Sequence, residues 1–328
     1  MSEEQQLLTE QELFRFSQDG YIGPFNSTLS NDVIDSVATK LKIMIDDRQH
    51  HPLYEQFSVR DWHLADDNVL KLLTDPALVE KLKQLLGEDL ILWRSKVFDK
   101  RSGEGPIGWH QEWGLFDGEE IGNNLPGLQP DTTVDDSFWD LTAWFALVDV
   151  DQEMGPLQFS PGTHKCRYPV AMKPMAESAF WQDPFLGIKQ TEILIRRANE
   201  NTLVLDVDTA DIFRDVNTNQ MSLAEAKQRV LAELSERIGA VTLGFDPKEA
   251  AVRSLIMKKG QFVIFTERVM HGSSPNLSAR RRIAINARVT RPNITVYPGR
   301  FSGQFRDGSN LDISKHWCIL ISGQDCIS

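Results

Sequence analysis

The order of the apolar patterns along the chain constrains the fold more than any other feature. Before Gly87, apolar residues recur at intervals of three and four positions, which predicts helices. After Gly87, short continuous apolar runs predict buried strands instead. Helix and strand do not alternate regularly, so a doubly wound parallel sheet is not favoured.

The patterns predict a mostly helical N-terminal third, a region of strands, and one later return to helix. A short strand at Tyr21 and Ile22 is expected directly after the first helix. The expected helices cover residues 9–18, 31–48, 76–86 and 222–238, and the expected strands cover residues 90–98, 141–150, 157–159, 261–265 and 283–289.

Helices followed by many short strands favour a mainly β fold with flanking helices. The expected core is a double-stranded β-helix, the jelly-roll barrel of the cupin type. We expect the 328 residues to form a single domain. Its expected parts are an N-terminal helical region of about residues 1–88 and a lid-like insertion of about residues 165–259.

The charge balance argues against two classes of partner. The chain has 35 basic and 47 acidic residues and a net charge of −12, whereas binding to nucleic acid or to an anionic membrane needs a basic face. The start of the chain lacks a signal-peptide pattern and no apolar run is long enough to span a membrane, which predicts a cytoplasmic protein. Three cysteines without CxxC spacing predict reduced thiols.

Two histidines and one glutamate form the strongest chemical signal. His110 and Glu112 are two residues apart, so in an extended segment both side chains point to the same face. His271 follows the expected strand 261–265 and is well placed to join them. Two imidazoles and one carboxylate suit ferrous iron and leave three octahedral positions open. The alternative for His110 is a core histidine with ordinary hydrogen bonds.

A group of arginines follows His271. Arg282 and Arg288 are an even number of positions apart, so in a strand they share one face and can carry positive charge into a barrel. A buried guanidinium needs an anionic partner, which a dicarboxylate would provide. Arg280 and Arg281 are equally well explained as a solvated basic edge.

Three motifs occur in order along the chain. They are residues 110–112 (HQE), residues 155–165 (GPLQFSPGTHK), and residues 271–276 (HGSSPN) followed by Arg282. Together they resemble the phytanoyl-CoA dioxygenase family of iron(II)- and 2-oxoglutarate-dependent oxygenases. Within that family the chain is similar to the non-haem iron halogenases that act on carrier-bound substrates, through Trp93-Arg94, residues 109–111 and residues 291–299.

The resemblance implies roles for six residues. His110, Glu112 and His271 would hold iron, and Arg282 would pair with the distal carboxylate of 2-oxoglutarate. Trp144 and Arg288 would assist near the cosubstrate, although Trp144 also fits a core aromatic residue. The implied cofactors are Fe(II), 2-oxoglutarate and dioxygen.

Glu112 separates this chain from its halogenase-like relatives, which have a small residue at that position and so leave a site for halide. The resemblance therefore implies hydroxylation of an unactivated carbon of a small molecule, such as an amino acid or acyl group of specialised metabolism, free or tethered to a carrier protein. The alternatives are a non-haem iron halogenase and a non-catalytic cupin-like protein that binds a metal such as zinc or a ligand. The aromatic residues Phe180, Trp181 and Phe185 make the insertion a candidate lid.

Overall fold

The computed structural model divides into two compact units. The first comprises Met1–Arg167, Phe245–Phe301 and His316–Ser328, and the second comprises Tyr168–Gly244 and Ser302–Lys315. Within the parts that the structure describes, no helix has the length and apolar character to cross a membrane. The described residues are 7–112, 127–130, 138–168, 170–174, 184–185, 187–200, 202–204, 209–237, 239–298 and 311–323.

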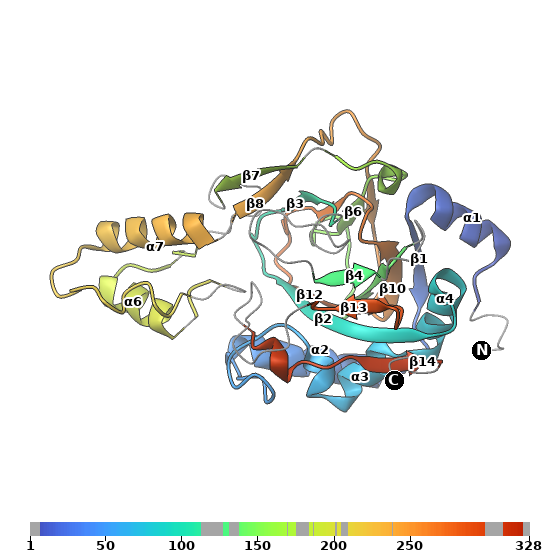
Figure 1. Ribbon diagram of the computed structural model, residues 1–328, viewed down its shortest axis with the longest axis horizontal. Helices are drawn as coiled ribbons and strands as arrows, with labels where there is room; N and C mark the ends of the chain where they lie inside the picture. The colour runs from blue at the N-terminus through green and yellow to red at the C-terminus, as the bar shows by residue number, and fades with distance from the viewer. Residues whose placement is uncertain are drawn as a thin grey trace. The chain divides into compact units, whose positions relative to one another are not determined.

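The helices of the first unit precede most of its strands, as predicted (Figure 1). Thr9 caps the first helix with a reciprocal pair of hydrogen bonds to Glu12, and Gly20 ends it in the left-handed conformation. The helices, with the single 3-10 turns marked η, are α1 (Glu10–Asp19), α2 (Asn31–Asp46), η2 (Trp62–Leu64), α3 (Asp67–Leu73), α4 (Pro76–Leu86) and η3 (Thr163–Lys165).

The strands of the first unit form two main antiparallel sheets. The larger has the order β1-β10-β5-β12-β2-β14 and the smaller has the order β3-β11-β6-β9, while β13 pairs with β4 separately. The strands are β1 (Tyr21–Asn26), β2 (Leu90–Lys100), β3 (Ile107–His110), β4 (Leu128–Pro130), β5 (Asp140–Ala146), β6 (Leu157–Phe159), β9 (Arg253–Leu255), β10 (Gln261–Thr266), β11 (His271–Ser273), β12 (Arg282–Thr290), β13 (Ile294–Val296) and β14 (Ile319–Ser322).

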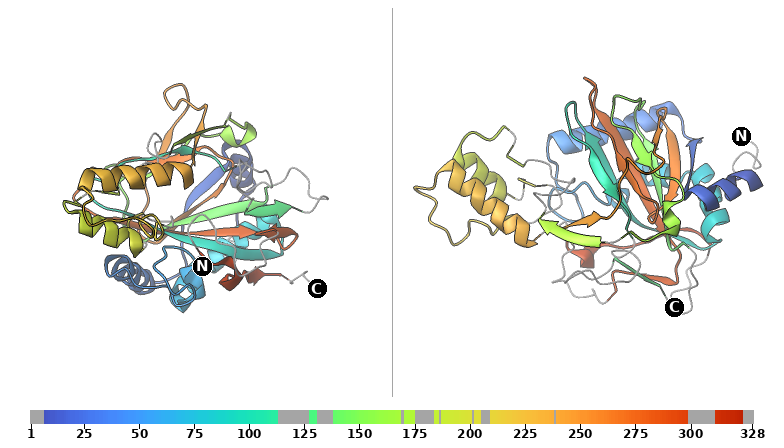
Figure 2. Two further views of the ribbon diagram at one scale, coloured as in Figure 1. Left: turned by 60° about the vertical axis from the view of Figure 1, so that its left-hand side comes forward. Right: turned by 90° about the horizontal axis from the view of Figure 1, so that it is seen from above.

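The larger sheet has a different core on each face. One face packs against the helices, which lie along one side of it in Figure 2, through residues such as Leu41, Leu82, Val97 and Ile285. The other face packs towards the smaller sheet through residues such as Trp144 and those in β6 and β10. Alternating residues of β12 therefore have alternating environments, as a period of two requires. This arrangement is the predicted jelly-roll core.

The second unit has its own small core. Its elements are β7 (Val170–Pro174), α6 (Thr191–Asn199), α7 (Leu223–Arg237), β8 (Gly239–Leu243) and η5 (Ile313–Lys315), with β7 and β8 paired. Phe185 is buried among apolar residues of α6 and α7 within this unit. Phe180 and Trp181 lie outside the described residues. This unit covers residues 168–244 and 302–315, whereas the expected insertion was about residues 165–259, and both the domain boundaries and the role of the insertion as a lid stay predictions.

Candidate metal centre

His110 and His271 meet across the smaller sheet. His271 of β11 pairs directly with His110 of β3, and the centroids of the two imidazole rings are 4.1 Å apart. Gly272 permits this close approach, because a Cβ atom there would lie 2.8 Å from the carbonyl oxygen of Ile107. The structure thus brings together two histidines that are 161 positions apart in the sequence, since 271 − 110 = 161.

Each histidine is held by a backbone carbonyl two residues before it. Nδ1 of His110 lies 2.8 Å from the carbonyl oxygen of Gly108, and Nδ1 of His271 lies 2.8 Å from that of Val269. A carbonyl only accepts a hydrogen bond, so each Nδ1 carries the proton and each Nε2 keeps a lone pair. Burial lowers the pKa of both imidazoles, that of His271 to about 3, with the neighbouring imidazole as a further cause for His271. Both rings are therefore neutral at physiological pH and suited to bind a metal.

Glu112 lies beyond the end of β3 and reaches the larger sheet. Its carboxylate accepts two hydrogen bonds from Arg288 of β12, at 2.7 Å from Nη1 to Oε2 and 2.9 Å from Nη2 to Oε1. Burial alone would raise the pKa of Glu112, but the charge and hydrogen bonds of Arg288 lower it to about 2. Glu112 is therefore an ionised carboxylate whose charge also acts on both histidines.

Among the residues described, no three His, Cys, Asp or Glu side chains come close enough together to hold a metal ion. Two of the three expected ligands are adjacent, and the third is paired with Arg288. The donor set still fits iron, because two neutral imidazoles offer Nε2 and an ionised carboxylate lies within electrostatic reach of both. The metal-binding role of His110, Glu112 and His271 stays a prediction.

The peptide segment that carries the ligands is fixed at two points. The side chain of Gln111 donates to the carbonyl oxygen of Arg268 at 2.9 Å, and the backbone N–H of Glu112 donates to that of Glu267 at 3.0 Å. Both acceptors belong to the turn that leads into His271. The residue between the two expected ligands therefore ties their segment to the strand of the third.

Arg282 lies deep in the barrel and stacks on Trp144. Its guanidinium carbon is 5.5 Å from the centroid of the indole ring, and it donates a hydrogen bond to the carbonyl oxygen of Gly155. Gly155 must be glycine, because its φ is +71° and a Cβ atom there would lie 2.6 Å from the carbonyl oxygen of Ser274. The structure thus brings Arg282 and Trp144 together, whereas Arg288 contacts Glu112 instead.

Lys100 is a second buried cation beside Arg282, and sequence reasoning missed it. The two residues are directly paired across β2 and β12 and are 2% and 1% exposed. Lys100 donates to the hydroxyl of Ser273 at 2.8 Å and to the carbonyl oxygen of Ser274 at 2.6 Å. Burial, with the charge of Arg282, lowers the pKa of Lys100 to about 7. The one sequence feature that could have indicated Lys100 is its even spacing from Arg94, because two residues an even number of positions apart in a strand point to the same face.

The buried pair of cations needs an anion. Nothing in the described part of the chain forms an ion pair with Lys100 or Arg282, and Nε of Arg282 has no hydrogen-bond partner there. The charge of Glu104 acts on both cations, and that of Asp99 acts on Arg282, but neither forms a direct ion pair with them. Burying two like charges side by side is costly unless a ligand neutralises them. A carboxylate of a dicarboxylic acid has the required charge and the geometry for a bidentate contact.

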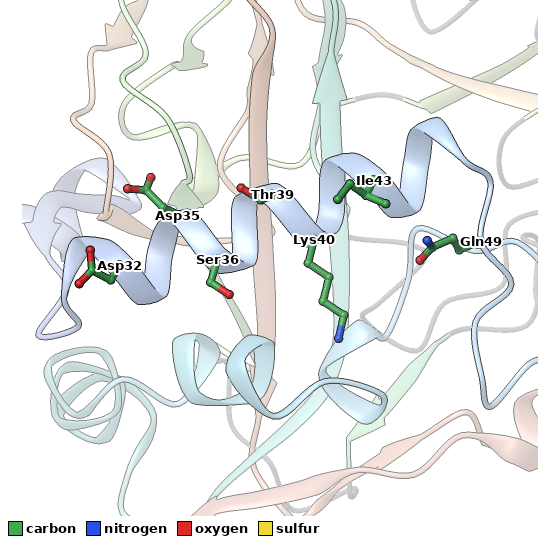
Figure 3. Close-up of a pocket in the computed structure, with 7 residues that line it drawn as sticks. All are labelled: Asp32, Asp35, Ser36, Thr39, Lys40, Ile43 and Gln49. Carbon is green, nitrogen blue, oxygen red and sulfur yellow. The ribbon is translucent and has the colours of Figure 1, made fainter.

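The outer face of α2 carries a separate shallow hollow (Figure 3). Two of its charged residues already have partners, since Lys40 pairs with Asp66 and Asp35 pairs with Lys259. It contains none of the residues expected in the site. Its lining residues are Asp32, Asp35, Ser36, Thr39, Lys40, Ile43 and Gln49.

Two solved structures have a fold similar to that of this chain. The structure "CytC3 with Fe(II) and alpha-ketoglutarate" has a TM-score of 0.62 and 20% identity, covering 98% of this chain and 91% of that one. The α-ketoglutarate-dependent epimerase SnoN from nogalamycin biosynthesis has a TM-score of 0.53 and 15% identity, covering 95% and 98%. Identities at this level show the fold alone, and they confirm the jelly-roll class.

Sequence relatives and a family profile complete the comparison. L-proline trans-4-hydroxylase of Streptomyces griseoviridis is 24% identical over 279 residues, covering 83% of this chain and 82% of that protein. A probable alpha-ketoglutarate-dependent hypophosphite dioxygenase of Stutzerimonas stutzeri is 29% identical over 107 residues, which span 33% of this chain and 32% of that protein. The profile of the phytanoyl-CoA dioxygenase (PhyH) family matches residues 16–284, well over half of the chain. The chain therefore belongs to the phytanoyl-CoA dioxygenase family, as its motifs indicated.

Proposed function

We propose that this protein is an iron(II)- and 2-oxoglutarate-dependent dioxygenase that hydroxylates an unactivated carbon of a small molecule. The observation that carries the proposal is the paired histidines with both Nε2 atoms left as acceptors. Family membership supports the class of enzyme and its cofactors, which are Fe(II), 2-oxoglutarate and dioxygen.

His110 and His271 would hold the iron through Nε2, and Glu112 would supply the third ligand. Iron bound there supplies the activation of dioxygen, coupled to oxidative decarboxylation of 2-oxoglutarate. The overall balance is one C–H bond, one dioxygen and one 2-oxoglutarate converted to one C–OH bond, succinate and carbon dioxide. As a ligand, Glu112 would occupy the coordination position that a halide needs, which favours hydroxylation over halogenation.

Arg282 and Lys100 would bind the distal carboxylate of 2-oxoglutarate. Their two charges lie side by side at the same depth in the barrel, and Trp144 covers the guanidinium from one side. A dianion bound there would neutralise both cations. Positioning of a bound reactant is how an enzyme lowers the entropic part of the barrier.

The substrate that we propose is a small molecule with an anionic group, such as an amino acid. Lys96 and Arg60 add positive charge near the site, since the charge of Lys96 acts on His110 and that of Arg60 acts on Arg288. An acyl group tethered to a carrier protein stays a second possibility for the substrate. The proline hydroxylase among the relatives supports a free amino acid by analogy alone.

The test is succinate formation from 2-oxoglutarate with added ferrous iron, in the presence of candidate amino acids and acyl compounds. Mass spectrometry should detect a product that has gained one oxygen. A gain of halogen in the presence of chloride would indicate the halogenase instead. Tight zinc binding with no turnover on any substrate would favour the non-catalytic metal-binding protein and contradict the proposal.

A further inference from the structure

Arg288 holds both oxygens of the expected third ligand. The two hydrogen bonds from its guanidinium to Glu112 are 2.7 and 2.9 Å long, and the two side chains are 14% and 15% exposed. This forked geometry fixes the orientation of the carboxylate as well as its position. The ion pair with Glu112 is enough to account for the burial of the Arg288 charge.

Arg288 is itself anchored from its other side. Nη1 lies 3.5 Å from Oδ2 of Asp140, which is 1% exposed in side-chain area. The indole N–H of Trp93 donates to Oδ1 of the same carboxylate at 2.8 Å. Three neighbouring strands, β2, β5 and β12, therefore supply a chain of contacts that ends at Glu112. Such support behind a metal ligand commonly sets its orientation.

The number of coordination positions makes this orientation consequential. Two imidazoles and one carboxylate oxygen leave three octahedral positions, which are two for a chelating cosubstrate and one for dioxygen. If both oxygens of Glu112 bound the metal, only two positions would remain. The long side chain of glutamate has the freedom to turn both oxygens towards a metal unless another group retains one of them.

We propose that Arg288 is a positioning residue that retains one oxygen of Glu112, so that the carboxylate offers a single oxygen to iron and the dioxygen position stays open. The inference rests on the proposed function. Asp140 and Trp93 serve it by fixing the guanidinium in place.

A second forked pair of the same chain provides a matched control. Arg281 donates to Asp99 through Nε at 2.6 Å and through Nη2 at 2.9 Å. This pair is also forked, although Arg281 uses Nε and Nη2 where Arg288 uses its two Nη atoms, and it involves neither histidine. Removing it tests what the loss of a forked ion pair does to the protein in general.

The experiment compares the full-length wild type with Arg288→Gln, Arg288→Lys, Asp140→Asn and Arg281→Gln under anaerobic conditions. Each protein is loaded with ferrous iron and 2-oxoglutarate, and loading is followed by the metal-to-cosubstrate charge-transfer absorption. Nitric oxide, a stable substitute for dioxygen, is then titrated. Crystals with Mn(II) in place of iron show how many oxygens of Glu112 bind the metal.

We expect Arg288→Gln to keep the charge-transfer band but to bind nitric oxide at least tenfold more weakly, with both Glu112 oxygens on Mn(II). Arg288→Lys and Asp140→Asn should show smaller losses of the same kind, and Arg281→Gln should match the wild type. If Arg288→Gln does not fold, Arg288→Lys and Asp140→Asn test the proposal by the same two measurements.

Unchanged nitric oxide binding and a single Glu112 oxygen on the metal in the folded site variants would overturn the inference while leaving the proposed function intact. A wild-type protein that shows no charge-transfer band would overturn the proposed function and this inference with it. The charge-transfer band of the wild type therefore distinguishes a failure of this inference from a failure of the proposed function.

Discussion

His110 and His271 pair directly across two antiparallel strands, and each donates its Nδ1 proton to a carbonyl two residues earlier in its own chain segment. Each Nε2 atom therefore keeps the lone pair that the predicted metal site requires.

Replacing either histidine by alanine should abolish tight metal binding. The loss of one imidazole ligand removes more than the roughly 10- to 100-fold that a supporting partner contributes, so a decrease of at least 100-fold in Co(II) affinity is expected. Calorimetric titration measures it. The exposed His50 provides the control, since His50→Ala should bind Co(II) as the wild type does. Equal Co(II) affinity in all the variants would remove the pair from the metal site.

Replacing Glu112 by alanine should end hydroxylation while leaving cosubstrate binding largely intact. The substitution removes the anionic oxygen ligand and leaves Arg288 without its partner beside the histidines. We expect a halide to be attracted there, so chloride should raise the thermal stability of this variant more than that of the wild type. Product mass spectrometry and thermal denaturation with sodium chloride or sodium acetate measure both effects. Undiminished hydroxylation would show that Glu112 is not a ligand.

Replacing Arg282 by methionine should weaken binding of 2-oxoglutarate selectively. A charge-assisted forked contact is worth about 1.5 to 3 kcal/mol, which corresponds to a rise of roughly 10- to 150-fold in Kd. The affinity for Co(II) should change little, because Arg282 is not a ligand. Titrating 2-oxoglutarate into the Co(II)-loaded protein measures the first quantity, and titrating Co(II) into the metal-free protein measures the second. If Arg282→Met lost affinity for 2-oxoglutarate and for Co(II) to the same extent, the substitution would have damaged the barrel as a whole.

Lys100 should make cosubstrate binding dependent on pH. Its pKa is lowered to about 7, so below pH 7 the free protein already carries the charge, and above pH 7 a proton must be taken up when the dianion binds. The Kd of 2-oxoglutarate should therefore rise with pH above 7, by up to about tenfold per pH unit. Titration calorimetry in buffers of different ionisation enthalpy measures the affinity and the proton uptake. Lys100→Met should bind more weakly and with a flat profile, and a wild-type Kd that falls with pH would contradict this role.

His63 should make the fold sensitive to acid. Burial lowers its pKa to about 4 from the ordinary 6.5, so its contribution to stability is complete above pH 6.5 and is lost as the pH falls towards 4. The shift corresponds to about 3 kcal/mol in the free energy of unfolding. Urea denaturation of the wild type and of His63→Gln at several pH values measures it. The difference in stability between the two proteins should shrink by about that amount between pH 6.5 and pH 4, and a constant difference would refute the assignment.

Local patterns in the sequence determined most elements and their faces. The helix Pro76–Leu86 and the strand Leu157–Phe159 have the expected bounds, because periods of 3.6 and 2 depend only on nearby residues. The even spacing that placed Arg282 and Arg288 on one face of β12 is the same kind of local rule. The two histidines were identifiable because their chemistry is specific, although their contact was not derivable.

Only the tertiary structure decided which charged groups meet. Arg288 pairs with Glu112, and Lys100 lies beside Arg282 because β2 and β12 pair in one particular register. Register depends on the packing of two whole faces of a sheet, summed over many side chains from distant parts of the chain. No local spacing encodes that sum, so the sequence alone determined the strands and the candidate ligands, and the packing of the barrel decided which residues they contact.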